Sequence, residues 1–407
     1  MEKRKILKIL IIEPYSTGHH MSLYLKHYLR AMSRAGWSVT LLTTTEAERS
    51  SAFTLAAGEF EKGRLHVEVM ESVSQIIYSG FFARIYAQFK WWFILRRNVK
   101  RVRAQVDFDA VYLPSVDHVM KAMSVFGSPF GDLPFYGLFF QPKHHRKSLG
   151  FRDRWIVRKV QKKIFSRCLA IPTFKKIFSI DLTFVHYAIE AHKIQARKLQ
   201  FVSDFSEISG DLSKADCRKV LGICESAIVV LVYGSLSPRK SVKSLLLALR
   251  NVNAERQVVV LLAGNPNDEF VKEFNETIFD LPELNNLINS RFFVHTSSDE
   301  FMVFQASDLV WIAYSSSFTG SSGVLFQAAY QGLPVIGSKH GLIGYTVTSN
   351  NIGVTCNPED ITDVTKTLER LVNDQQLVRK LRESSKKFGE TNSSLSHIST
   401  VLKALES

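Results

Sequence analysis

Residues 315–344 read SSSFTGSSGVLFQAAYQGLPVIGSKHGLIG, and they follow a hydrophobic run over residues 308–314 that predicts a buried strand. A strand, a loop of Gly, Ser and Thr, and a helix that begins near Gly323 direct several backbone N–H groups at one point, where the helix dipole also favours negative charge. The helix is expected over residues 324–331 and should stop at Gly332. The stretch predicts a site for an anion such as phosphate. The alternative is an ordinary strand–helix turn whose glycines serve packing alone.

The string GSSGVLFQAAYQGLPVIGS within this stretch resembles the nucleotide-sugar loop of retaining GT-B glycosyltransferases of family 4, which reads E-G-F-G-x-x-x-x-E-A-x-A-x-G-x-P-V. The end of the pattern matches residues 328–335, so the two family glutamates fall at Thr319 and Gln327, and both are replaced. The resemblance implies that the first position contacts the donor sugar and the second the ribose hydroxyls, for which Gln327 keeps an amide and Thr319 a hydroxyl. The replacements leave open which sugar is carried and whether the chain is catalytic. The donor-binding residues expected here are Thr319, Gly320, Ser321, Ser322, Gly323, Val324 and Gln327.

A second turn in the same half of the chain resembles another loop of that family. Residues 227–233 predict a strand, and the turn after it begins at Gly234 and reads GSLSPRKS. The family loop reads G-R-L-x-x-x-K-G, and its Arg and Lys neutralise the donor diphosphate. Lys240 keeps the lysine position, whereas Ser235 replaces the arginine and leaves Arg239 as the cation that could compensate. We expect Lys240 and Arg239 to act catalytically by stabilising charge, and Gly234 and Ser235 to bind the donor.

The turn after a later strand, residues 291–294, carries His295 and Thr296. The resemblance implies that the nucleobase of the donor lies against this turn, so both residues are donor-binding candidates. Simple capping of the helix expected over residues 300–306 is the alternative.

The opening of the chain predicts a Rossmann-like domain, with a strand over residues 6–13 and a helix over residues 21–35. The turn between them lacks the GxGxxG pattern, which argues against an NAD-type dehydrogenase. The resemblance implies that this turn meets the acceptor or the donor phosphates. Gly18 is therefore a donor-binding candidate, and His19 and His20 are acceptor-binding candidates, with an exposed loop imidazole as the alternative.

A further group follows the strand expected over residues 134–140. Ligands of open α/β sheets bind beyond the carboxyl ends of the strands, which is where His144, His145 and Arg146 would lie. Since a histidine of this region often contacts the donor sugar in the resembled family, His144 and His145 are catalytic candidates and Arg146 an acceptor-binding candidate.

The positive charge of the chain lies in its first half. Residues 1–205 hold 33 Lys and Arg against 16 Asp and Glu, whereas the remaining residues hold 19 and 22. This asymmetry predicts a polyanionic partner, either an anionic membrane surface or a nucleic acid. Two basic helices, expected over residues 76–103 and 151–167, carry much of the charge. The first combines aromatic side chains with a basic end, which suits a helix in a membrane interface or a core helix with a dipole-compatible end.

Other features of the sequence limit cofactors and location. The apolar start of the chain is short and lacks a cleavage site, and no window approaches the about 20 apolar residues of a spanning helix. The four cysteines lack metal spacing, which predicts a reduced, cytoplasmic protein, peripheral on the inner face of a membrane if it binds one. We expect neither a cofactor nor a metal, because cationic side chains and helix amides can carry a diphosphate's charge.

The sequence thus predicts an α/β protein of GT-B architecture, with two Rossmann-like domains whose parallel sheets face an inter-domain cleft. The expected parts are an acceptor-binding domain (1–205), a nucleotide-sugar domain (206–390) and a last helix (391–407) that crosses back to the first domain. The expected activity is transfer of a sugar, with retention, from a nucleoside diphosphate sugar to a lipid-linked or membrane-associated acceptor. The alternatives are an RNA-directed glycosyltransferase and a non-catalytic nucleotide-binding subunit of a glycan-assembly complex.

Overall fold

The computed structural model describes residues 6–15, 20–61, 63–71, 81–149, 155–192, 197–292 and 296–407. The chain divides into two compact units, and each is described by itself. The first comprises residues 1–147, 152–203 and 394–407, and the second residues 148–151 and 204–393. The sequence predicts that the chain passes from the first domain to the second after residue 205 and returns at residue 391. In the structure the main passages between the units come after Ser203 and before Ser394.

The first unit is built on a seven-stranded sheet in the order β3-β2-β1-β4-β5-β6-β7, and its strand pairs are parallel. Such sheets are covered by helices on both faces, which is why their strands read as nearly continuous apolar runs. The strands are β1 (Lys8–Ile12), β2 (Ser38–Thr44), β3 (Leu65–Met70), β4 (Ala110–Leu113), β5 (Phe135–Phe139), β6 (Phe174–Ser179) and β7 (Leu199–Phe201).

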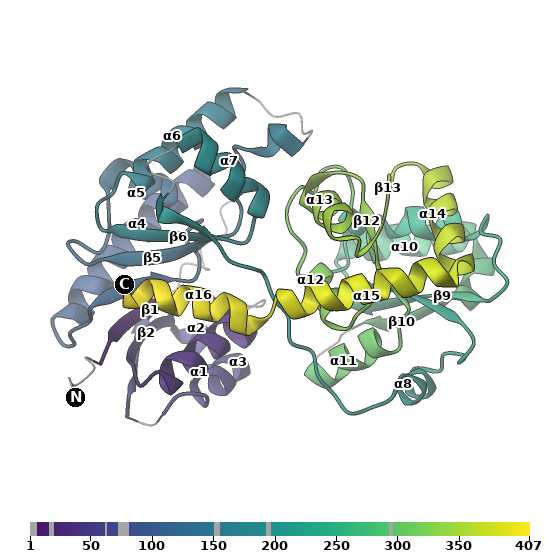
Figure 1. Ribbon diagram of the computed structural model, residues 1–407, viewed down its shortest axis with the longest axis horizontal. Helices are drawn as coiled ribbons and strands as arrows, with labels where there is room; N and C mark the ends of the chain where they lie inside the picture. Colours follow the sequence, from purple (N-terminus) through teal and green to yellow (C-terminus); the bar gives the residue numbers. More distant parts are fainter. Residues whose placement is uncertain are drawn as a thin grey trace. The chain divides into compact units, whose positions relative to one another are not determined.

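Helices cover both faces of this sheet because the chain reverses its direction across the sheet after β3, while each crossover keeps the same hand. Figure 1 shows α1 to α3 on one side and α4 to α7 on the other. The helices are η1 (His20–Leu25), which runs into α1 (Lys26–Arg34), α2 (Thr45–Glu48), α3 (Ser51–Ala57), α4 (Phe81–Arg103), α5 (Met120–Phe126), η2 (Arg146–Leu149), α6 (Trp155–Leu169), α7 (Leu182–His192) and α16 (Ser394–Glu406).

Helix α4 is a core helix. Its Trp91, Trp92, Leu95 and Val99 are buried in a hydrophobic cluster that also includes residues of the sheet. The indole nitrogen of Trp92 also donates to Gly127 O at 2.9 Å. Trp91 and Trp92 therefore belong to the core. Tyr86 and Phe93 of the same helix are 61% and 57% exposed, so its place in a membrane interface stays a prediction.

Helix α16 is anchored to the first unit by a buried chain of hydrogen bonds. His397 is fully buried, and its Nδ1 donates to Ser203 O at 2.5 Å, since a carbonyl oxygen can only accept. Its Nε2 must then accept from the Tyr28 hydroxyl, 2.7 Å away, and Tyr28 accepts in turn from Tyr112 at 2.6 Å. Burial lowers the pKa of His397 from 6.5 to about 4. The last helix is thus held by a neutral imidazole.

The second unit is built on a six-stranded sheet in the order β10-β9-β8-β11-β12-β13, and its strand pairs are also parallel. Two hydrophobic clusters cover its two faces. The predicted α/β class and the two parallel-sheet Rossmann-like domains are confirmed. The strands are β8 (Ile228–Tyr233), β9 (Val258–Gly264), β10 (Ile288–Phe292), β11 (Leu309–Ile312), β12 (Val335–Ser338) and β13 (Gly353–Cys356).

The helix predicted over residues 324–331 is α12, which runs from Gly323 to Tyr330. Gly332 follows it in the left-handed region with φ of 65°, which is the helix stop that the sequence predicts. The other helices of this unit are α8 (Lys214–Leu221), η4 (Pro238–Lys240), α9 (Val242–Leu249), α10 (Asp268–Asp280), η5 (Pro282–Leu287), α11 (Ser297–Gln305), α13 (Gly341–Asn350), α14 (Ile361–Asn373) and α15 (Gln375–Thr391).

Within the described ranges, no helix is both long and apolar enough to span a membrane. Three of the cysteine thiols, those of Cys168, Cys217 and Cys356, are buried, whereas Cys224 is exposed.

Candidate functional site

The strand order of the second unit identifies where a ligand can enter. From β8 the chain moves outward through β9 to β10, and it then returns to lay β11 on the other side of β8. The loops after β8 and β11 therefore leave the sheet in opposite directions, and ligands of open α/β sheets bind at such a point, beyond the carboxyl ends. The turn that begins at Gly234 and the loop over residues 313–322 are these two loops.

Lys240 is the charged group at this point. Its side chain is only 2% exposed. Its Nζ donates to Tyr233 O at 2.6 Å and to the Tyr314 hydroxyl at 3.2 Å, and it lies 4.8 Å from the centre of the Tyr314 ring. Among the residues that the structure describes, no carboxylate forms an ion pair with it. A buried cation without a counter-charge is expensive, so the site favours an anion.

The N-terminus of α12 adjoins this lysine. The hydroxyl of Ser322, the residue before the helix, lies 3.1 Å from the Tyr314 hydroxyl and does not cap the helix. Gly234 has φ of 96°, and a Cβ added there would lie 3.9 Å from both Lys240 Nζ and Val324 Cγ2. Backbone N–H groups in the first turn of a helix lack intrahelical partners and favour negative charge. The structure thus brings Gly234, Lys240, Ser322 and Val324 together, as the sequence predicts for an anion site.

Arg239 lies on the same side as Lys240, although neighbouring residues need not do so. Its guanidinium carbon is 4.8 Å from the centre of the Phe318 ring and 5.4 Å from that of Tyr314. Its carbonyl accepts from Ser315 N at 2.9 Å, which ties the β8 turn to the β11 loop. Arg239 is exposed, so it adds a second cation at the surface of the site. Ser235, on the same turn, is exposed as well.

Gln327 is buried on α12, with 2% of its side chain exposed. Its Nε2 donates to Oε1 of Glu300 on α11, and the Tyr233 hydroxyl donates to the same oxygen at 3.0 Å. The amide oxygen of Gln327 is buried without a hydrogen-bond partner in the described part of the chain. Burial, with the Glu300 charge as a further cause, raises the pKa of Tyr233 above its usual value. Gln327 therefore offers an oxygen that can accept a hydrogen bond, and its amide nitrogen is hydrogen-bonded to the Glu300 carboxylate.

Glu300 was missed by the sequence analysis. Glu300 is the first residue of the helix that the sequence predicts after the expected nucleobase turn. Nothing in the neighbouring sequence indicates that α11 brings this carboxylate to α12. Thr296 caps α11, since its hydroxyl accepts from Asp299 N at 3.0 Å and the Asp299 carboxylate accepts from Thr296 N, which confirms the capping alternative. His295 lies outside the described residues. Thr319, Gly320 and Ser321 are half-buried in the loop before α12.

The structure gives His144 and His145 no exposed position. Both are 2% exposed and lie in the first unit, packed against Phe184, with ring centres 5.1 and 5.4 Å away. His145 Nε2 is 3.1 Å from Asp181 Oδ2. Burial alone would raise the pKa of Asp181, but hydrogen bonds and the charge of His145 hold that pKa below its usual value. The two histidines are therefore packed side chains of the first unit, and their catalytic role stays a prediction.

The other candidates of the first unit are only partly described. Gly18 and His19 lie outside the described residues, and so does the side chain of His20 at the start of η1. Arg146 is half-buried in η2.

A group of three or more His, Cys, Asp or Glu that could hold a metal ion is absent from the residues that the structure describes. Two aspartates separated by one residue, a spacing that can bind a metal ion, occur at Asp107 and Asp109. They precede β4 in the first unit, and Asp109 Oδ2 there accepts from Lys8 N at 2.9 Å.

Comparisons with known proteins bear on the family and on the fold. Residues 213–388 match the family model described as glycosyl transferases group 1. A search of curated proteins found no match to the chain.

Solved structures share the fold over nearly the whole chain. Anabaena Alr3699/HepE in complex with UDP and glucose is similar with a TM-score of 0.68 and 16% identity, over 98% of this chain and 99% of that one. The sucrose-phosphate synthase of Thermosynechococcus elongatus gives 0.70 and 14%, over 98% of each chain. WaaG, a glycosyltransferase involved in lipopolysaccharide biosynthesis, gives 0.63 and 14%, over 98% of this chain and 99% of that one. The chain thus has the GT-B fold of these structures, and its residues 213–388 match the family model of glycosyl transferases group 1.

Proposed function

We propose that the chain transfers a sugar from a nucleoside diphosphate sugar to an acceptor, and that the donor diphosphate binds at the carboxyl ends of β8 and β11. The observation that carries the proposal is the buried Lys240, which has no carboxylate partner among the described residues and lies beside the start of α12. A diphosphate supplies the missing negative charge. Because the related Anabaena protein binds UDP and UDP-glucose, a uridine donor is the first to test.

In this proposal the chain acts mainly by electrostatic stabilisation. The bond between the anomeric carbon and the diphosphate oxygen breaks, and the diphosphate leaves with the electron pair. Lys240 and the first amides of α12 stabilise the charge that develops there, and Arg239 adds a cation at the surface. The acceptor hydroxyl oxygen then bonds to the same face of the sugar, since the family resemblance implies retention, and its proton passes to the departing diphosphate. We propose that these groups carry the charge without a metal ion.

The pair of Gln327 and Glu300 is proposed to hold the ribose of the donor. The buried amide oxygen of Gln327 can accept from a ribose hydroxyl, and Glu300 fixes the amide so that this oxygen points away from the carboxylate. A carboxylate thus stays at the site although position 327 carries an amide. This arrangement supports a working site in spite of the replaced glutamate.

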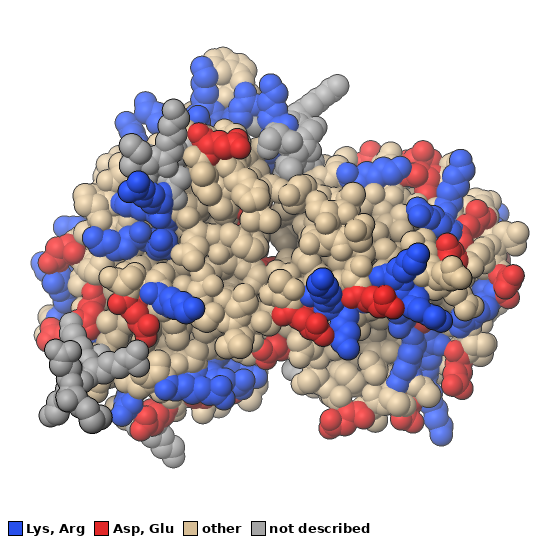
Figure 2. Space-filling view, in the orientation of Figure 1, with Lys and Arg blue, Asp and Glu red and all other residues tan. Residues whose placement is uncertain are grey.

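For the acceptor we propose a lipid-linked or membrane-associated molecule, with the first unit binding an anionic membrane surface from the cytoplasmic side. The support comes from α6, whose described start exposes apolar side chains beside cations. Trp155 is 57% exposed, and Lys159 Nζ lies 4.7 Å from the centre of its ring. Figure 2 shows Lys and Arg side chains gathered over this part of the first unit. Exposed Trp and Ile beside Lys are typical of a helix in a membrane interface.

A second candidate is a non-catalytic nucleotide-binding subunit of a glycan-assembly complex. The observation in its favour is the replacement of both family glutamates, at Thr319 and Gln327.

Nucleotide release separates the two functions. UDP- and GDP-sugars are incubated with the protein and a panel of acceptors that includes lipid-phosphate-linked glycans in liposomes and RNA. Release of the nucleotide with a lipid-linked acceptor supports the proposal. Release with RNA alone would show that the acceptor is RNA and not a lipid-linked molecule. Donor binding without release on any acceptor would favour the subunit.

A further inference from the structure

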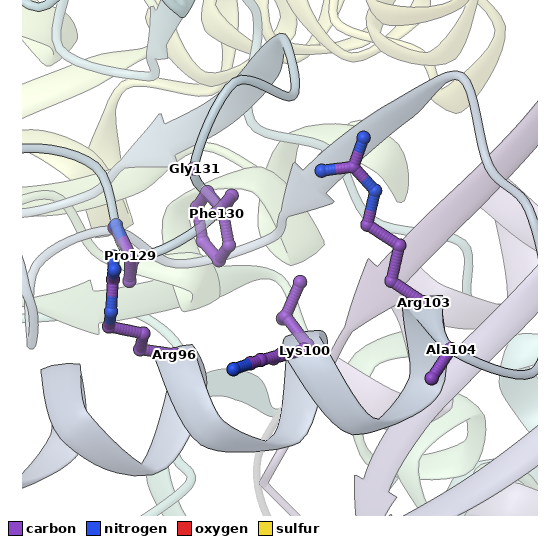
Figure 3. A pocket seen from close by; sticks show the side chains of 8 residues that line it. Arg96, Lys100, Arg103, Ala104, Pro129, Phe130 and Gly131 are labelled. Atoms are coloured by element: carbon purple, nitrogen blue, oxygen red, sulfur yellow. The ribbon is translucent and has the colours of Figure 1, made fainter.

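A cavity of about 350 Å³ lies on the first unit, against the second half of α4 and the loop before β5. Its floor is apolar, formed by Val99, Pro129 and Phe130, and Val99 and Phe130 are buried. Its rim carries Arg96, Lys100 and Arg103 from α4. Figure 3 shows Arg96 and Arg103 extending from the helix on either side of Phe130, with Lys100 between them. The cavity thus combines an apolar floor with a cationic rim.

The cations of α4 fall into two sets, and the set at the cavity forms fewer ion pairs with carboxylates. On another face of the helix, Arg97 pairs with Glu71, and Arg101 pairs with Glu68. At the cavity, Arg103 pairs with the exposed Asp132 at 2.5 Å, whereas no ion pair of Arg96 or Lys100 with a carboxylate exists within the described ranges. The guanidinium of Arg96 lies over the Trp92 ring at 5.5 Å. The rim therefore carries an excess of positive charge.

The spacing of these cations suits a phosphate group. They lie at i, i+4 and i+7 of one helix, so they share a face and span about 10 Å along the axis. Favourable interaction with the negative end of the helix dipole accounts for Arg103 in the last turn, but Arg96 lies two turns earlier. Arg and Lys in such a cluster bind phosphate by charge-assisted hydrogen bonds.

The cavity is separate from the strand ends that ligands of the fold occupy. The end of α4 leads into β4, and the loop over residues 128–132 leads into β5, so both lie at the amino-terminal edge of the first sheet. Ligands of such sheets bind at the carboxyl edge. An amphiphilic cavity at the opposite edge is a second site.

We propose that this cavity binds a phosphate-bearing ligand with an apolar part, the phosphate on Arg96 and Lys100 and the apolar part over Val99 and Phe130. Such chemistry occurs in the head region of an anionic lipid, and the phosphate alone could also come from a free phosphate compound. Binding here would tether the first unit to a phosphorylated amphiphile at a place remote from its sheet's carboxyl edge.

Two double variants of α4 test this assignment. Arg96→Gln/Lys100→Gln removes two of the three cations at the cavity and keeps polar, though shorter, side chains. Arg97→Gln/Arg101→Gln removes the same charge from the same helix outside the cavity. Titration calorimetry is run on the full chain with dihexanoyl phosphatidic acid below its micelle concentration, with pyrophosphate and with dihexanoyl phosphatidylcholine. Thermal unfolding checks that both variants fold.

The first variant should bind phosphatidic acid about tenfold more weakly than the wild type, as loss of charge-assisted hydrogen bonds implies, and the second by less than about twofold. If phosphatidic acid binds more tightly than pyrophosphate, the ligand of the cavity is an amphiphile. Equal affinities with the same variant pattern assign the phosphate site to a free phosphate compound. Equal weakening in both variants, tight binding of phosphatidylcholine, or no binding of either anion at millimolar concentration would overturn the proposal. UDP binding should be the same in both variants.

Discussion

Gln327 shows how a single replacement changes the partners of a site without removing its charge. The resembled family has a glutamate at this position, whereas here the carboxylate belongs to Glu300, and Gln327 donates to it. The amide oxygen of Gln327 stays buried without a partner in the described part of the chain. An acidic side chain at position 327 would meet the Glu300 carboxylate directly. The two positions should therefore depend on each other.

A charge swap between these positions measures that dependence. Gln327→Glu should lower the free energy of unfolding at pH 7 by about 2 kcal/mol, because two carboxylates then share one buried site and a donated hydrogen bond is lost. The double variant Glu300→Gln/Gln327→Glu should recover most of the loss, since it restores one amide and one carboxylate. Urea unfolding of the wild type, both single variants and the double variant gives the comparison. Additive losses in the double variant would show that the two side chains are not coupled.

Lys240 should matter for turnover and not for folding. Lys240→Met leaves a slightly shorter, unbranched side chain and removes its charge, so we expect kcat/KM for the donor to fall about a hundredfold, as loss of one stabilising group for a leaving anion does. The thermal midpoint should stay equal or rise, because an unpaired buried cation is replaced by an apolar chain. Lys243→Met, an exposed lysine three residues further on, is the control. Unchanged turnover in Lys240→Met would remove this lysine from the mechanism.

At the scale of the element, α16 and α6 show what a helix pattern does and does not reveal. The sequence predicts a last helix over residues 391–407, and α16 runs from Ser394 to Glu406. Its attachment depends on His397 bonding to Ser203 O and the Tyr28 hydroxyl, far away in the sequence. The sequence could not predict that histidine's neutral state, since it follows from burial by these distant partners.

The attachment of α16 predicts a pH dependence of stability. The pKa of His397 is about 4 in the folded chain and 6.5 ordinarily, so the unfolded state binds the proton more readily. Stability is complete above pH 6.5, falls as the pH is lowered toward 4, and loses about 3 kcal/mol over this interval. His397→Gln should keep a hydrogen-bonding amide and lose this part of the pH dependence. Unfolding free energies of both proteins at pH 7 and pH 4.5 test this, and equal slopes would contradict it.

The exposed start of α6 predicts selective binding to anionic membranes. The wild type should sediment with liposomes that contain phosphatidylglycerol and not with neutral ones, because Lys159 and its neighbours contribute only where the surface is negative. Trp155→Ser/Val160→Ser should weaken this binding at least about tenfold, since each side chain contributes about 1.5 to 3 kcal/mol when buried.

Phe279→Ser is the control for the α6 variant, because Phe279 is 86% exposed on α10 of the second unit. Equal failure of the wild type to sediment with both kinds of liposome would argue against a membrane-associated acceptor.

At the scale of the whole molecule, local patterns predicted the architecture, and distant contacts decided the site. Apolar strands, the glycine that ends a helix and the turn after β8 each depend on a short stretch of sequence. The two parallel sheets and α12 could therefore be predicted. His144 and His145 follow β5 as expected, but Phe184 on α7 covers them, about 40 residues further along the chain. Glu300 reaches Gln327 only because of the order of the strands. For the helix expected over residues 76–103 the sequence left an interface or a core position open, and Trp92 is buried by partners that the sequence does not identify.

Calorimetric titration of the wild type and of Gln327→Ala with UDP and with GDP tests the central claim most directly. The account predicts that one nucleotide binds and that the substitution weakens its binding by about 1 kcal/mol or more, since a buried hydrogen bond is lost. Binding that is equal in the two proteins would move the ribose away from Gln327. Failure of both nucleotides to bind the wild type would contradict the donor site at the carboxyl ends of β8 and β11.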